Sequence, residues 1–459
     1  MAGIGFLLRK LINKDHLSGI LGGYLFSALI TTGPWLFTIL ALGGIALFGE
    51  RFASPDQMLV FRLVIIYNFS FSLVISGPIT MVITRYLSDK IYQRDISELP
   101  NFLFGSLILI YTIQLPIAYF FYLYYVDLEL NIAFAAIINY LLISGIWLVS
   151  VFISTLKDYV TISLTFALGM AVAVLASFYS GQKFSEAGII WGFNLGLGII
   201  LFVLFARILS GLQYKSGSFW GFMGYFRKFW DLALCGLGYN LAIWVDKWIM
   251  WFSPKAQALP NGFVSYPYYD TAMFIAYLTI VPSMAVFFVN IETSFFEKYI
   301  NFYNDIQQHA PLKKIEQNQS GIIRNLFESS RNLIIFQGLI SFLAIFLAPR
   351  LFDLLKINYL LLGMFRLGVL GAFFHVLSLF LFIILFYFDF RRTSLGLILL
   401  MFSINAIFTW VSMKMGFPFY GYGYFLSSLV TFTLTFFITF YYIGTLAYRT
   451  FVKNNPSLR

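Results

Sequence analysis

The chain has 459 residues, of which 60% are hydrophobic and only 11% are charged. Soluble domains carry charge on about a quarter of their residues, so this composition excludes an ordinary soluble protein and indicates a polytopic membrane protein. The formal net charge is +10. We attribute it to basic residues beside the membrane and to their attraction to anionic lipid headgroups, so no nucleic-acid partner is needed to explain it.

Stretches without Asp, Glu, Lys or Arg indicate where helices cross the membrane. A crossing of the roughly 30 Å hydrocarbon core takes about 20 apolar residues. Eleven charge-free stretches approach or exceed that length: 16–49, 63–84, 99–126, 130–156, 159–182, 187–206, 271–291, 332–349, 367–388, 393–413 and 415–448. A twelfth crossing is expected between Asp231 and Ser253, and it has to include Asp246 and Lys247. We therefore predict an all-α integral membrane protein with about 12 transmembrane helices.

The basic residues predict the orientation of these helices. Twelve crossings place both termini on one side, and most of the Lys and Arg residues fall in segments on that side. Such an excess is typical of cytoplasmic segments, so we expect both termini in the cytoplasm. Arg350, Lys356 and Arg366 lie on the opposite side, against this trend, and two starts of the tenth helix stay open. A start near Tyr359 would make Arg366 an intramembrane substrate-path candidate, whereas a start at Leu367, which we favour, makes it an outer boundary residue.

The basic segment 207–231 divides the expected helices into two groups of six. We therefore expect an N-terminal six-helix lobe at 1–206, a basic cytoplasmic linker at 207–231 and a C-terminal six-helix lobe at 232–459. Transporters are commonly built from two related halves. The second and eighth helices each contain a proline and an acidic-Lys-aromatic exit, which fits such a repeat.

Prolines inside expected helices predict kinks. A proline removes a backbone donor and clashes with the preceding turn, and a neighbouring glycine loosens the helix further. A kink either lets a helix rock during gating or is static and improves packing, and both interpretations stay open. The candidates for kinks or gating are Gly33, Pro34, Gly77, Pro78 and Pro282.

The seventh expected helix contains two adjacent charges in the sequence "NLAIWVDKWIMWF". At about 100° per residue, Asp246 shares a helix face with Tyr239, whereas Lys247 shares another face with Asn240. They do not form an i, i+4 pair, so each is expected to seek a partner on another helix or in water. Their calculated depth and the surrounding tryptophans fit a helix boundary within an aromatic belt. Alternatively, Asp246 lines the transport path and contacts substrate or a coupling proton, with Lys247 and Tyr239 as further candidates.

Other polar and aromatic features also have a structural and a functional interpretation. Arg85 and Asp89 are spaced for an interfacial i, i+4 ion pair. His375 is expected to be hydrogen-bonded structure, with a role as ligand or base as the alternative. Tyrosine-rich segments at outer ends either form an aromatic belt or stack on sugar rings. These segments are 119–125, 266–269 and 417–425.

No motif indicates an enzyme. There is no P-loop, dinucleotide fingerprint, HExxH or Cys-x-x-Cys in the sequence. The single cysteine, Cys235, excludes a disulfide framework and a cysteine-rich metal site, and we expect a buried, inert thiol. The longest stretch outside the expected helices, 299–331, is too short for a catalytic domain. We therefore expect no catalytic residue, no cofactor and no metal.

The N-terminal part of the chain resembles a known family. The stretches "MAGIGFLLRKL" at 1–11, "TTGPWLFTI" at 31–39 and "SGPITMVITRYLSDKIY" at 76–92 resemble the PelG family, the inner-membrane transporters for Pel exopolysaccharide. The resemblance implies the fold of the multidrug, oligosaccharidyl-lipid and polysaccharide exporters. In that fold, two six-helix lobes enclose a central cavity, and the first and seventh helices line the lobe interface.

The resemblance also implies a location and partners. They are the bacterial inner membrane, an amino-sugar-rich polysaccharide substrate, a cytoplasmic glycosyltransferase, and membrane proteins that include a cyclic-di-GMP sensor. We therefore expect transport of a Pel-like exopolysaccharide from cytoplasm to periplasm for biofilm formation. A flippase or exporter of a lipid-linked oligosaccharide or a small molecule is the alternative.

Overall fold

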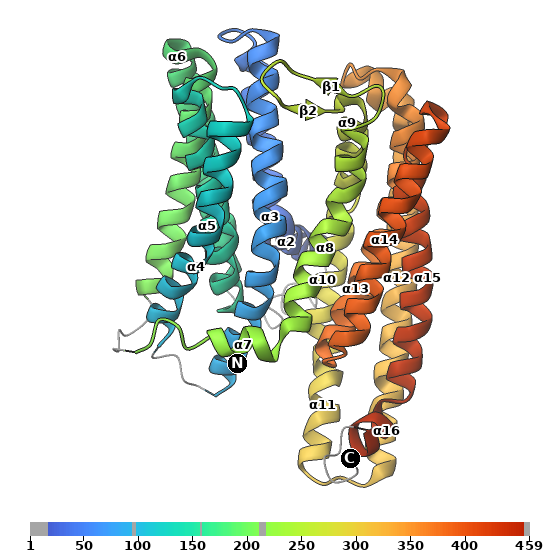
Figure 1. Cartoon of the computed structure of the whole chain (residues 1–459). Helices are drawn as coiled ribbons and strands as arrows, with labels where there is room; N and C mark the ends of the chain where they lie inside the picture. Colours follow the sequence, from blue (N-terminus) through green and yellow to red (C-terminus); the bar gives the residue numbers. More distant parts are fainter. Residues whose placement is uncertain (1–16, 94–97, 157, 211–216, 454–459) are drawn as a thin grey trace. The chain divides into compact units, whose positions relative to one another are not determined.

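The structure, a computed structural model, describes residues 17–93, 98–156, 158–210 and 217–453 (Figure 1). The described chain is almost entirely helical, and ten of its helices are long and apolar enough to cross a membrane. The predicted all-α membrane fold is therefore confirmed. The motif at 1–11, both chain ends and part of the predicted linker lie outside the described residues, so the orientation of the termini stays a prediction.

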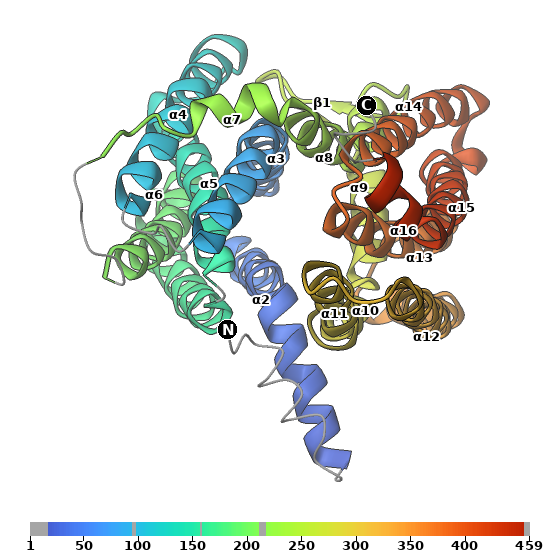
Figure 2. The ribbon, with the colours of Figure 1, turned by 90° about the horizontal axis from the view of Figure 1, so that it is seen from below.

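The first helices cover the charge-free stretches, and the helix that contains 63–84 extends beyond that stretch at both ends. They are α2 (Leu17–Gly49), α3 (Pro55–Tyr92), α4 (Leu99–Phe120) with the π-helix η1 (Phe121–Tyr125), α5 (Leu130–Thr155) and α6 (Tyr159–Ser210). The start of α3 is fixed by a capping box. Ser54 Oγ accepts from the Gln57 backbone N–H at 3.2 Å, and Gln57 Oε1 accepts from the Ser54 N–H at 2.9 Å. Within this region α5 contacts α3, α4 and α6 (Figure 2).

The 52 residues of α6 form two antiparallel helices and not one. The helix is interrupted at Phe184 and Ser185, and Ser185 has a φ of 47°. The two halves then lie against each other, because Ser177 Oγ donates to the Ile189 carbonyl at 3.0 Å. The fifth and sixth helices predicted at 159–182 and 187–206 are therefore both present.

The ends of these two halves meet at Asp158. Arg207 Nε lies 2.8 Å from the Asp158 Oδ2. Burial raises the pKa of the Asp158 carboxyl, but hydrogen bonds from Arg207 and Thr161 outweigh burial and hold the pKa below its ordinary value. This ion pair closes the α6 hairpin at the end opposite Ser185.

The chain continues through α7 (Met223–Lys228), α8 (Trp230–Met250) and a short antiparallel hairpin of β1 (Gln257–Ala258) and β2 (Val264–Ser265). The helix α8 is the predicted seventh crossing, and it carries Asp231, Asp246 and Lys247. Counting α8 and both halves of α6 would bring the crossings to the predicted twelve, and that number stays a prediction.

The remaining helices lie between residues 267 and 453. They are α9 (Pro267–Leu278), α10 (Val281–Asn290), η2 (Ile291–Phe295), α11 (Phe296–Gln307), α12 (Leu312–Leu354), η3 (Tyr359–Leu361), α13 (Leu362–Tyr387), α14 (Arg391–Met415), η4 (Phe417–Phe419), α15 (Tyr422–Gly444), α16 (Leu446–Tyr448) and η5 (Arg449–Lys453). The expected eighth helix is interrupted between Leu278 and Val281, directly before Pro282. Pro282 is accommodated in the first turn of α10, where its missing N–H costs little.

Two expectations in this part were wrong or incomplete. The tenth helix does not start at Leu367, because helical structure begins at Tyr359 and α13 at Leu362, so Arg366 lies inside α13 with an exposed side chain. The segment 299–331 is not only a connection. It is a helical hairpin of α11 and the first half of α12 (Figure 1), in which Lys314 Nζ lies 2.8 Å from Asp305 Oδ1.

The contacts divide the chain into two compact units, residues 32–266 and residues 267–459 together with 1–31. The first unit has a core that includes Phe152, Phe193 and Phe222, and the second has one that includes Phe295 and Phe380. The helix α8 belongs to the unit 32–266, because it packs against α3. The two six-helix lobes at 1–206 and 232–459, and the linker at 207–231, stay a prediction.

Candidate functional site

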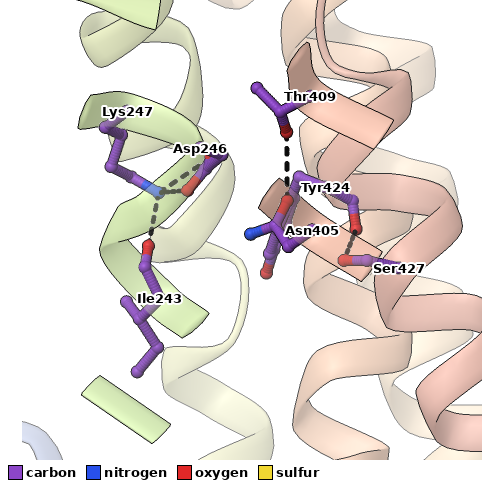
Figure 3. A network of polar contacts seen from close by, with 7 residues as sticks. All are labelled: Ile243, Asp246, Lys247, Asn405, Thr409, Tyr424 and Ser427. Atoms are coloured by element: carbon purple, nitrogen blue, oxygen red, sulfur yellow. Dashed lines mark hydrogen bonds and ion pairs between the residues drawn. The ribbon is translucent and has the colours of Figure 1, made fainter. Parts of the chain in front are cut away.

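Asp246 and Lys247 form a buried ion pair near the end of α8. Asp246 has no exposed surface and Lys247 is 8% exposed. Lys247 Nζ lies 3.1 Å from both carboxylate oxygens of Asp246 and donates to the Ile243 carbonyl at 3.0 Å (Figure 3). The sequence analysis did not anticipate that the two adjacent charges would pair with each other. Adjacent residues point about 100° apart, but the four-carbon lysine stem is long enough to fold back across that arc.

Two of the three tryptophans near this pair, Trp248 and Trp251, are packed against α3. Trp248 stacks on Phe71 with ring centroids 4.9 Å apart, and Trp251 stacks on Tyr67 at 4.6 Å. Trp251 is only 3% exposed. The rings of Trp248 and Trp251 therefore lie against protein, while Lys247 lies in the last turn of α8. The boundary and substrate-path interpretations both stay open.

Tyr67 also fastens the β1–β2 hairpin. Its hydroxyl donates to the Val264 carbonyl at 2.7 Å and accepts from the Val264 N–H at 3.2 Å. The Tyr67 ring stacks further on Phe121, which stacks on Tyr125. The ring faces of Phe121 and Tyr67 are therefore occupied by protein. The exposed aromatic residues within 119–125 are Tyr119, Phe120, Tyr124 and Tyr125.

The candidate Gly77 is the point at which the backbones of α3 and α8 meet. A Cβ on Gly77 would lie 2.6 Å from the carbonyl oxygen of Gly236, and a Cβ on Gly236 would collide with Gly77 in turn. Asn240 Nδ2 donates to the Leu73 carbonyl at 3.1 Å, in the turn before Pro78. Gly77 therefore permits close helix packing, and its proposed part in gating is a separate prediction.

The other site candidates are spread over the chain. Tyr239 is half-buried and lies about two turns before Asp246 on α8. Gly33 and Pro34 lie inside α2, where Thr38 Oγ1 donates to the Pro34 carbonyl at 2.8 Å. Arg366 is on α13, in the other compact unit. Among these candidates, the structure brings Asp246 and Lys247 together in an ion pair.

A buried amide network escaped the sequence analysis. Asn68 Nδ2 donates to Asn139 Oδ1 at 2.8 Å, Asn139 Nδ2 donates to Asn194 Oδ1 at 2.7 Å, and the Tyr122 hydroxyl donates to Asn68 Oδ1 at 2.6 Å. Such bonds join membrane helices, here α3, α5, α6 and η1. The signal was present as isolated asparagines within apolar stretches, but their pairing depends on the tertiary fold.

In the unit formed mainly by 267–459, His375 is 4% exposed and is flanked by tyrosines. Its ring centroid lies 5.9 Å from that of Tyr277 and 6.1 Å from that of Tyr424. Its role stays open. The predicted Arg85–Asp89 ion pair is present, with Arg85 Nε 3.2 Å from Asp89 Oδ1. The described residues include no group of three or more His, Cys, Asp or Glu side chains that could hold a metal ion.

Solved structures with the same fold are transporters. The chain has a TM-score of 0.65 and 14% identity to an outward-facing multidrug resistance transporter of the MATE family and MOP superfamily, covering 96% of this chain and 98% of that one. A MATE structure in the straight conformation gives 0.62 and 12%, covering 92% and 96%. A MOP superfamily transporter from Pyrococcus furiosus gives 0.60 and 14%, covering 92% and 95%. At these identities the likeness shows the fold alone.

A comparison with curated proteins gave no match. The family comparison did, because the PelG family, described as "Putative exopolysaccharide Exporter (EPS-E)", matches residues 1–451. That range includes the buried pair on α8, the amide network and every helix that could cross a membrane. The chain therefore belongs to the PelG family, within the fold of the MOP superfamily transporters.

Proposed function

We propose that this protein exports an amino-sugar-rich exopolysaccharide across the bacterial inner membrane, from cytoplasm to periplasm. The match to an exopolysaccharide exporter family over residues 1–451 carries this proposal, since a helical transporter fold alone would fit many substrates. The protein acts as a transporter and not as an enzyme. Both termini lie in the cytoplasm, where most of the basic residues gather.

Asp246 and Lys247 are our candidates for the substrate path. Charged residues inside membrane helices are costly and are retained mostly where they have a task. In the described structure the carboxylate is already neutralised by Lys247 Nζ at 3.1 Å. A cationic amino sugar would take the place of that ammonium group, and Lys247 would turn toward water. Tyr239 and Arg366 are further candidates for the same path.

We further propose that export is coupled to synthesis. The resemblance to PelG transporters supports a complex with a cytoplasmic glycosyltransferase and with membrane proteins that include a cyclic-di-GMP sensor. Export of a small molecule or a lipid-linked oligosaccharide is the second candidate, since a multidrug resistance transporter has the same fold.

The function is tested in cells that lack the chromosomal copy. Secreted and cytoplasmic polymer are measured after the wild-type chain is returned, and we expect extracellular polymer only when the chain is present. Polymer that is exported equally well without the chain would show that the proposed function is wrong. Loss of a lipid-linked precursor from the periplasmic leaflet, with no free polymer formed, would identify the second candidate.

The site is tested with Asp246→Asn as the only copy, because the change keeps the side-chain volume and removes the charge. We expect lower export for each copy of the protein that reaches the membrane, so the level of protein in the membrane is measured alongside. Asp56→Asn is the matched control, since Asp56 is an exposed carboxylate in the first turn of α3. Unchanged export by Asp246→Asn would remove this residue from the path without affecting the proposed function.

A further inference from the structure

Residues 217–230, the α7 segment, lie between α6 and α8 in the chain. Their six-residue helix α7 lies across the ends of α3 and α8 instead of running along them (Figure 1 and Figure 2). The segment meets α3 where the apolar stretch of that helix ends at Arg85. Next to Arg85, Tyr86 packs against Tyr225 of α7, with ring centroids 4.9 Å apart. The α7 segment is therefore at the depth at which α3 changes from apolar to charged.

One side of the α7 segment is packed on the protein. Phe222 is fully buried, and its ring centroid lies 4.9 Å from that of Phe102 on α4. A Cβ on Gly105 of α4 would collide with the Phe219 carbonyl oxygen, so the two backbones are in direct contact. Phe229, at the other end of α7, is also buried. These contacts hold the segment against the ends of the helices.

The α7 segment also exposes large apolar side chains. Phe219 is 41% exposed, Trp220 46%, Met223 44% and Trp230 50%. A single exposed apolar side chain is ordinary, but four in one short segment form a patch that marks an interaction surface. Tryptophan is enriched at the boundary between lipid and water, because one end of its ring system is apolar and the other is polar. The patch therefore has the composition of a surface that lies in the lipid headgroup region.

Two exposed cations accompany this patch. Arg227 and Lys228 lie in the last turn of α7. Among the described residues neither forms an ion pair, whereas Arg85 is paired with Asp89 at 3.2 Å. Lys228 Nζ lies 5.2 Å from the centroid of the Phe229 ring. Arg85 Cζ lies 5.1 Å from the same centroid, so positive charge collects at this point.

The exposed cations of the α11–α12 hairpin are arranged differently. Lys314 Nζ lies 2.8 Å from Asp305 Oδ1, and Arg324 Nε lies 3.0 Å from Glu328 Oε1. Their charge is balanced within the protein, whereas Arg227 and Lys228 present theirs to the surroundings. An anionic partner is therefore favoured at α7 in particular, and not at every basic surface of the chain.

Exposed aromatic side chains and unbalanced cations on a helix that lies in the plane of the membrane surface are the combination that binds anionic lipid. We propose that the α7 segment binds anionic phospholipid headgroups. Arg227 and Lys228 contact the phosphate groups, and Phe219, Trp220 and Met223 lie among the first carbons of the acyl chains. This lipid site is independent of the transported substrate, and neither experiment below measures transport.

The lipid preference is tested by native mass spectrometry of the purified, delipidated full-length protein, which is given equal amounts of phosphatidylglycerol and phosphatidylcholine. We expect an excess of bound phosphatidylglycerol in the wild type. The excess should fall several-fold in Arg227→Gln with Lys228→Gln, because each basic residue near an anionic surface strengthens binding. The matched control is Lys313→Gln with Arg324→Gln, which removes the same two residue types from exposed positions of α12 and should keep the excess.

Inorganic phosphate separates a lipid site from a site for free anions. Phosphate lacks acyl chains, so at the concentration of the lipid it should leave the bound phosphatidylglycerol in place. Its displacement by phosphate would overturn the proposal. An unchanged excess in the Arg227 and Lys228 variant, or an equal loss in the control, would overturn it as well.

The depth of the segment is tested with a spin label on Gly224→Cys, in a Cys235→Ala background and in liposomes of the same two lipids. A Cβ on Gly224 meets nothing within 4 Å, so the label has room. Gln308→Cys, in the exposed turn between α11 and α12, is the aqueous reference. We expect the label at 224 to collide several-fold more often with oxygen, and less often with a water-soluble nickel chelate, than the label at 308. Equal collision rates at the two positions would show that water or another protein covers α7, and the proposal would be wrong.

Discussion

Lys247 neutralises Asp246 from the neighbouring position on the same helix, so the two residues act as one unit. Removing one partner of a buried pair leaves an uncompensated charge, whereas replacing both by neutral groups avoids that penalty. The pair is buried, with 0% of Asp246 and 8% of Lys247 exposed. A loss of transport in a single variant therefore has to be separated from a loss of stability.

We predict that Lys247→Met destabilises the protein by about 3–5 kcal/mol, because the Asp246 carboxylate then lacks its ammonium partner. The double variant Asp246→Asn with Lys247→Met should recover most of this loss. Thermal unfolding of purified variants measures the difference. If the double variant unfolds normally and still fails to export, the pair contributes to transport. If the single variant is as stable as the wild type, the pairing does not stabilise the fold.

At the scale of elements, the contact between α3 and α8 depends on two glycines. The carbonyl oxygen of Gly236 would lie 2.6 Å from a Cβ on Gly77, far inside van der Waals contact. Toward the C-terminal end of α8, the two helices are joined by the stacking of Trp248 on Phe71 and of Trp251 on Tyr67. The position of the Asp246–Lys247 pair is therefore set by how closely α8 approaches α3.

We predict that Gly236→Ala lowers stability by about 1–3 kcal/mol, the usual cost of overpacking. Gly198→Ala is the matched control, since a Cβ there meets nothing within 4 Å. The control should be neutral or slightly stabilising, because alanine favours a helix. Thermal unfolding of both variants tests this, and equal unfolding temperatures would mean that the helices separate readily.

The sequence predicted the helices that are apolar over their whole length. It missed the full extent of helices that have both a charged and an apolar part. Charge-free stretches located most crossings, and α8 was inferred in spite of Asp246 and Lys247. The same criterion could not follow α12 before residue 332, because that part of the helix carries charged residues such as Lys314 and Arg324. It also placed the tenth helix too late, since Arg366 is tolerated with an exposed side chain.

The candidate site was only partly predictable for a related reason. Helix periodicity correctly placed Asp246 and Lys247 on different faces of the helix. Periodicity gives only the direction of each Cβ, so it did not show that the long lysine side chain can fold back to the neighbouring carboxylate. The bonds among Asn68, Asn139 and Asn194 join three helices. Which asparagines meet is set by helix packing, and a single sequence does not contain that information.

For the whole molecule, the testable property is the topology, that is, on which side of the membrane each connection between helices lies. The β1–β2 hairpin and the turn between α11 and α12 fall on opposite sides if the basic residues set the orientation. Ala258 in the hairpin and Gln308 in the turn both have exposed side chains. The natural cysteine, Cys235, is fully buried, so a cysteine-free background requires one substitution.

We predict that Ala258→Cys, in a Cys235→Ala background, reacts with a membrane-impermeant thiol reagent in intact spheroplasts. Gln308→Cys should react only after the membrane is opened. The Cys235→Ala background without a new cysteine is the control for unspecific labelling. The reverse pattern would show that the termini face the periplasm and that the predicted orientation is wrong.

The two-residue connection inside α6 has a consequence for biosynthesis. Only Phe184 and Ser185 interrupt the helix, so a short tip, with Lys183 and Glu186 on either side of these two residues, has to pass through the hydrocarbon core. The hydrogen bond from Ser177 Oγ to the Ile189 carbonyl joins the two halves of the hairpin. We expect the two halves of α6 to pair with each other during synthesis. The hairpin would then enter the bilayer as one unit and not as two separate helices.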